Sequence, residues 1–132
     1  MTQTVRVPAE TLDLPVRQPA LISVLRFAAL QCRTAPRASV TGCALLDPAA
    51  TAEDHAAALA LCLPQMLLRR PVVHRPGTRR RSFDEDWLVA LARALASGDR
   101  ASARFLARRR ARPEAVPYLT LLVRGLTERL YD

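Results

Sequence analysis

The second half of the sequence is divided into helices by residues that start and stop helices. Ser82 and Glu85 stand in the S-x-x-E pattern of a capping box, in which each side chain bonds the backbone N–H of the other residue. Apolar residues then recur at helical spacing as far as Gly98, a residue typical of the position that follows a helix. We expect Phe83 and Trp87 to be core anchors of this helix rather than platforms for a nucleobase. The predicted core stripe consists of Phe83, Trp87, Leu88, Leu91 and Leu95.

A helical hairpin is predicted at the end of this helix. Asp99 can cap a further helix over residues 100–111, with Phe105 and Leu106 as its apolar anchors. The outline also fits a helix-turn-helix, but Asp99 and Arg104 fall where that motif needs apolar packing residues. An antiparallel hairpin that serves the core is therefore the better interpretation.

A last helix is predicted to run to the C-terminus. Pro113 and Pro117 both fit within the first turns of such a helix, where a missing backbone N–H costs little. Its stripe consists of Leu119, Leu122, Val123, Leu126 and Leu130. Tyr118 and Leu121 leave the helix apolar on more than one side, which indicates either a buried central helix or a contact in a homodimer.

The first eighty residues carry less regular signals. Residues 1–17 contain two prolines and a short polar–apolar alternation, which favour an extended arm. One helix is expected after Pro19, and a second is expected to begin at the capping residue Thr51. Pro64 should kink or break the second helix before a short final turn. Residues 34–50 fit either a short strand or a turn.

These elements fit one domain that spans residues 1–132. A chain of 132 residues, half of them apolar, can bury one core of ordinary size. We predict an all-α fold, a compact bundle of about five helices with an extended N-terminal arm and a C-terminal helical hairpin plus final helix. Residues 82–130 should form its most regular half, and residues 69–81 a long exposed basic loop.

The charge of the chain is strongly positive and comes entirely from arginine. Twenty basic residues stand against twelve acidic ones, which gives a formal net charge of +8, and lysine is absent. The absence of lysine is most simply explained by a GC-rich coding sequence, so the excess of arginine can reflect composition alone. Six arginines nevertheless fall within residues 69–81 and six within residues 100–112, and neither window contains an acid. Such focused charge favours acidic partners.

The two windows provide a candidate binding site. Arg100, Arg104 and Arg108 follow at i, i+4 and i+8, so they lie along one helix face, with Phe105 and Leu106 turned elsewhere. Such a row can follow a phosphate backbone. The complete predicted site consists of Arg79, Arg80, Arg81, Arg100, Arg104, Arg108, Arg109 and Arg110.

Three interpretations of these arginines are open. The first is a small cytoplasmic bacterial protein that binds nucleic acid through its phosphates, with little reading of sequence. The second is an acidic partner other than nucleic acid, either an anionic membrane surface or a protein that a helical adaptor or regulator binds; such an adaptor can also bind a second copy of itself. The third is a solvated arginine face without a partner.

Catalytic and metal chemistry has little support in the sequence. His55 and Cys62 share a helix face, but about 10 Å of helix axis separates them, too far for a catalytic dyad. The three cysteines contain no C-x-x-C pair, so neither a zinc site nor a disulfide framework is expected, and we infer a reducing cytoplasm. We therefore expect no enzyme, no metal and no cofactor. The apolar stretch at residues 20–30 is interrupted by Arg26 and is too short to span a bilayer.

Overall fold

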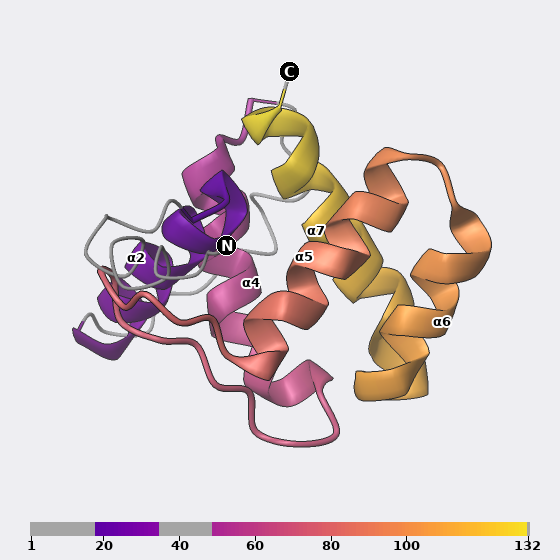
Figure 1. Cartoon of the computed structure of the whole chain (residues 1–132), viewed down its shortest axis with the longest axis horizontal. Coiled ribbons are helices and arrows are strands. Elements are labelled where there is room, and N and C mark those ends of the chain that lie inside the picture. Colours follow the sequence, from indigo (N-terminus) through magenta and orange to yellow (C-terminus); the bar gives the residue numbers. More distant parts are fainter. Residues whose placement is uncertain (1–17, 35–48, 132) are drawn as a thin grey trace, which may run out of the picture.

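The computed structural model of the chain describes residues 18–34 and 49–131. Within these ranges the chain forms five α-helices and one short 3-10 helix, and it contains no strands (Figure 1). The helices are α2 (Ala20–Thr34), α4 (Ala52–Met66), α5 (Phe83–Ala96), α6 (Arg100–Arg110) and α7 (Val116–Leu130), and the 3-10 helix η1 (Pro113–Ala115) leads into α7. The predicted all-α bundle is confirmed. The predicted arm over residues 1–17 lies outside the described residues, as do residues 35–48 of the segment that fits either a strand or a turn.

Three helices begin at the capping residues that the sequence indicates. The backbone N–H of Asp54 donates to Thr51 Oγ1 at 3.1 Å, and that of Thr51 donates to the Asp54 carboxylate at 2.9 Å, which completes a capping box on α4. Ser82 and Glu85 form the same reciprocal pair on α5, at 3.0 and 2.9 Å. Asp99 accepts a backbone N–H of the first turn of α6 at 3.1 Å. Each cap satisfies N–H groups that have no helical partner, and is worth about 1 kcal/mol.

Pro64 does not end its helix, so of the two predicted effects, a kink or a break, the break is wrong. α4 continues past Pro64 to Met66 and ends at Leu67, whose backbone is extended. Proline lacks one helical N–H, but Leu67 still donates to the carbonyl oxygen of Leu63 at 3.2 Å. Because α4 packs between α2 and α7, its burial offsets the lost bond. The short final turn expected after Pro64 is the end of α4 itself, and within the described residues no separate helix lies between α4 and α5.

α7 is the central helix of the bundle. It packs against α2, α4, α5 and α6, and it runs from the end of α6 across the molecule to the C-terminus (Figure 1). The predicted stripe is confirmed, with full burial of Leu119, Leu122, Val123 and Leu126 and partial burial of Leu130. Of the two apolar residues outside this stripe, Tyr118 is partly buried against the core and Leu121 is 49% exposed, so packing within the chain accounts for Tyr118 only, and a homodimer contact through α7 stays a prediction.

α4 and α7 approach each other closely at one glycine. A Cβ atom on Gly125 would lie 2.6 Å from His55 Cδ2, closer than side-chain atoms pack. His55 is buried, and its Nδ1 lies 3.0 Å from the carbonyl oxygen of Thr51. Because a carbonyl oxygen only accepts, Nδ1 is the donor in this contact. Gly125 thus provides the space that the imidazole ring occupies.

α5 and α6 form the predicted hairpin. Gly98 has a φ of 76°, a left-handed conformation that glycine adopts without strain. Trp87 Nε1 donates to the carbonyl oxygen of Leu106 at 2.8 Å, which ties the start of α5 to the second half of α6, as antiparallel helices require. The buried side of α6 carries Ala103 and Ala107, small residues that let the helices approach closely.

Two predicted core anchors of the hairpin lie at the surface instead. Phe83 is 68% exposed and Phe105 is 60% exposed, whereas Trp87 is buried as expected. α6 packs through alanines, so its phenylalanine points away from the core. Phe83 is the first residue of α5 and lies beyond the edge of the core. The hairpin therefore presents two aromatic rings to its surroundings.

A short antiparallel bridge joins the ends of α4 and α6. The backbone N–H of Leu68 donates to the carbonyl oxygen of Arg110, and that of Arg112 donates to the carbonyl oxygen of Met66, both at 2.8 Å. These bonds place the start of the basic loop, residues 69–81, beside the end of α6.

Candidate functional site

A buried ion pair between α2 and α5 lies beneath the basic loop. Arg26 of α2 is 2% exposed, and Glu85 of α5 is fully buried. Two guanidinium nitrogens of Arg26 donate to the two carboxylate oxygens of Glu85, at 2.8 and 2.9 Å. Arg26 also donates to the carbonyl oxygens of Thr78 and Arg80, at 2.7 and 3.2 Å. The pair therefore anchors the backbone of the loop as well as joining two helices.

The charge of Glu85 is stabilised even though burial opposes it. Burial alone would raise the pKa of this carboxyl group. The hydrogen bonds from Arg26, with those from the backbone N–H groups of Ser82 and His74, outweigh burial and lower the pKa below its ordinary value. The hydrogen bond to Glu85 in turn raises the pKa of Arg26. Both groups therefore carry their charge at neutral pH.

Asp84 connects the loop to the end of α6. Its carboxylate accepts a hydrogen bond from the backbone N–H of Val72 at 2.8 Å and forms an ion pair with Arg110. Glu85, the next residue, accepts from the backbone N–H of His74 at 3.0 Å. The basic loop is thus held through its backbone, while most of its arginine side chains are exposed.

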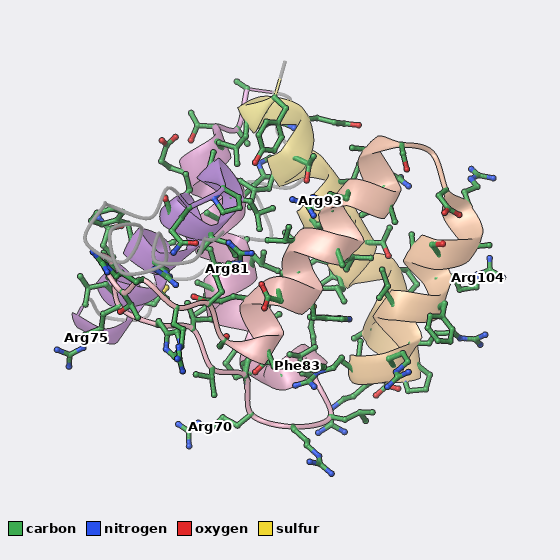
Figure 2. All side chains as sticks on the ribbon, in the orientation of Figure 1. Arg70, Arg75, Arg81, Phe83, Arg93 and Arg104 are labelled. Carbon is green, nitrogen blue, oxygen red and sulfur yellow. The ribbon has the colours of Figure 1, made fainter. Side chains whose placement is uncertain are left out.

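The loop arginines 79–81 do not join the arginines of α6. Arg81 forms an ion pair with Asp86 at 2.6 Å and donates to Gln18 Oε1 at 3.3 Å. Gln18 also donates to a carbonyl oxygen of the loop at 2.8 Å. These contacts draw the end of the loop toward the start of α2. Figure 2 shows Arg81 and Arg104 on opposite sides of α5.

The predicted arginines of α6 do gather on one surface. Arg100, Arg104, Arg108 and Arg109 are exposed, and none of them forms an ion pair within the described part of the chain. Together with Phe105, they line a shallow hollow along the outer side of the helix. We call these four arginines the α6 arginine face.

The electrostatics of α6 favours an anion on this face. Like charges one turn apart destabilise a helix by a few tenths of a kcal/mol per pair. The helix dipole stabilises cations in the last turn, where Arg108, Arg109 and Arg110 lie, but it does not stabilise Arg100 in the first turn. Arg110 alone among the arginines of α6 has a carboxylate partner among the described residues. A bound anion would relieve the remaining repulsion.

A second hollow lies at the open end of the hairpin. It has a volume of about 550 Å³ and is lined by residues of α5, of α6 and of the start of the basic loop, among them Arg69. The guanidinium carbon of Arg110 lies 4.8 Å from the ring centroid of Phe83, and that of Arg109 lies 5.6 Å from the ring centroid of Phe105. Both distances are within the range of cation–π contact. We call this hollow the hairpin groove.

Sequence reasoning missed Arg69, Phe83 and Phe105 as surface neighbours of the arginines. A signal for Phe105 was present, because Ala103 and Ala107 recur one turn apart and form a buried face of small residues. Viewed down the helix axis, Phe105 falls among the arginines opposite those alanines. Arg69 and Phe83 carry no such local signal, since contacts between distant segments place them.

Away from the arginines, a metal site would need several titratable side chains of the described residues to lie together. Among the described residues, no group of three histidine, cysteine or acidic side chains is placed to hold a metal ion. Cys62 Sγ lies 3.9 Å from the hydroxyl oxygen of Tyr118, and burial together with this thiol raises the pKa of Tyr118. In residues 18–34 and 49–131, no helix combines the length and apolar character needed to cross a membrane.

Comparison with known proteins identifies no relative of this chain. No protein-family model matches it, and neither a curated protein nor a solved structure matches it. A functional proposal must therefore rest on its own residues and their geometry.

Proposed function

We propose that the chain binds nucleic acid through its phosphates, on the α6 arginine face. The observation that carries the proposal is the row of four exposed arginines along one side of α6, without a carboxylate partner in the described residues. A nucleic acid backbone presents a regular row of negative charges, and a guanidinium group binds phosphate through a planar set of donors. The face and the backbone are thus complementary in charge and in form.

The composition of α6 supports contacts to phosphates rather than a reading of sequence. The helix contains no asparagine, glutamine or acidic residue, the side chains that read adenine and cytosine edges. Contacts from arginine to phosphates give strong attraction with little discrimination between sequences. We expect binding that depends on salt and varies little with base order.

The test removes three charges from the α6 arginine face. The variant Arg100→Gln, Arg104→Gln and Arg108→Gln changes exposed residues only, so the fold should persist by circular dichroism. Binding of a labelled mixed-sequence DNA strand, of its duplex and of the matching RNA is measured by fluorescence anisotropy over a series of salt concentrations. We expect affinity to fall at least tenfold at low salt. The salt slope for duplex should decrease by about 0.9 for each phosphate contact that is lost.

A matched variant controls for net charge. This control removes the same number of charges, three, from exposed positions outside α6: Arg75→Gln, Arg93→Gln and Arg124→Gln. Figure 2 labels Arg75 and Arg93. This control should bind nearly as well as the unchanged chain. Equal losses in both variants would show that binding follows net charge alone and would contradict the proposed surface. No binding of any nucleic acid by the unchanged chain at low salt would refute the proposal and favour the adaptor interpretation.

A further inference from the structure

Exposed apolar side chains concentrate at the hairpin groove. Eight large apolar side chains are exposed among the described residues, and three of them, Leu68, Phe83 and Phe105, line this one hollow. Single exposed apolar residues are ordinary on protein surfaces. A group of them around a hollow is typical of a binding site.

The groove is also basic and continuous with the α6 arginine face. Arg69, Arg109 and Arg110 line it together with the two phenylalanines, and no acidic residue of the described part of the chain does. Phe105 and Arg109 line both the groove and the hollow of the arginine face, so the two surfaces share an edge. A strand held by phosphate contacts along α6 would reach the groove without a gap.

Contacts among residues that line the groove position the two rings. Trp87 Nε1 bonds the carbonyl oxygen of Leu106, which fixes α5 against α6 next to both phenylalanines. Arg110 is held by its ion pair with Asp84 and stacks on Phe83. The rings therefore form a prepared surface, and most of the area of each is still accessible.

We propose that the hairpin groove binds unpaired nucleobases by stacking on Phe83 and Phe105, so that the chain prefers single strands to duplex. This inference rests on the proposed function, because it needs phosphate contacts on the α6 arginine face. Exposed aromatic rings beside arginines are the combination that binds single strands, since every base offers a flat face to a ring. Bases in a duplex are already stacked and cannot reach the groove. The basic lining favours this polyanion over a protein segment as the occupant.

The test removes the ring faces and keeps the charge. The variant Phe83→Leu with Phe105→Leu keeps apolar side chains at two exposed positions, so the fold should persist by circular dichroism and thermal melting. Its matched control is Phe27→Leu, an exposed phenylalanine of α2, which lies at the opposite end of the molecule from α6 (Figure 1). The probes are a labelled single strand, an abasic strand with the same number of phosphates, and a duplex of the same length.

The unchanged chain should bind the base-containing strand at least about tenfold more tightly than the abasic strand, given the usual strength of base–aromatic stacking. The double variant should lose this preference, while Phe27→Leu should retain it. Trp87, the one tryptophan of the chain, lines the groove, so its fluorescence should change with the base-containing strand and not with the abasic one.

Two outcomes would overturn the inference. The first is equal affinity of the unchanged chain for all three probes. The second is a preference for the base-containing strand that persists in the double variant. Either result would favour a protein partner as the occupant of the groove. In either case, loss of binding in the variant of Arg100, Arg104 and Arg108 would leave the proposed function standing. If no probe binds, both proposals fail together.

Discussion

Replacement of Glu85 by glutamine is expected to destabilise the fold by about 3–5 kcal/mol, the usual cost of removing one partner of a buried ion pair. Glutamine has nearly the same size, but it puts an NH₂ group where a carboxylate oxygen accepts. Glu85 accepts four hydrogen bonds, two from Arg26 and one each from the backbone N–H groups of Ser82 and His74. Two of the donors would then face another donor, and Arg26 would remain charged and 2% exposed without a counter-charge.

The uncompensated charge should account for most of this loss. Arg26→Met in the Glu85→Gln background removes that charge, so the double variant should cost less than the sum of the two single variants. For groups in direct contact, such a coupling free energy amounts to up to about 3 kcal/mol. The double variant should still be less stable than the unchanged chain, because the carbonyl oxygens of Thr78 and Arg80 lose their donor as well.

Urea unfolding at neutral pH, followed by far-UV circular dichroism, measures these free energies. Asp86→Asn is the matched control, because it removes one partner of the exposed Arg81–Asp86 pair and should cost less than about 1 kcal/mol. A free-energy cost of Glu85→Gln no larger than that of Asp86→Asn would refute the role assigned to the buried ion pair. Additive effects of the substitutions at Arg26 and Glu85 would also refute it.

Two further predictions concern stability. Gly125→Ala should destabilise the fold by about 1–3 kcal/mol, because the new methyl group would lie 2.6 Å from His55 Cδ2; in a His55→Ala background the same substitution should lower the melting temperature much less, and an equal effect in both backgrounds would contradict the clash. Acid should also weaken the fold: because the pKa of Glu85 is lowered on folding, its stabilisation is present above the carboxyl pKa of the unfolded chain and is lost as the pH falls through the lowered folded value. Urea unfolding over an acidic pH series should show a smaller decline for Glu85→Gln than for the unchanged chain, and equal declines would exclude Glu85 as the cause.

The boundaries of the helices could be predicted because they depend on neighbours in the chain. Thr51, Ser82 and Asp99 cap helices through hydrogen bonds that span three residues, and Gly98 ends a helix through its own φ angle. The stripe of α7 was predictable for the same reason, since burial on one side of a helix repeats every three or four residues. The row of Arg100, Arg104 and Arg108 on one face also follows from this period alone.

Contacts between distant segments decided the rest. Arg26, which the sequence shows only as an interruption in an apolar stretch, is buried because Glu85, fifty-nine positions away, supplies its counter-charge. Phe83 and Phe105 fit apolar stripes, yet both lie at the surface. Phe105 does so because the alanine side of α6 faces the core, and Phe83 because the core does not extend to the first residue of α5. Periodicity states which residues share a face, but it does not state how much of that face a neighbouring helix covers. That depends on side-chain volumes and on where a partner helix lies, and both are determined only when the whole chain packs.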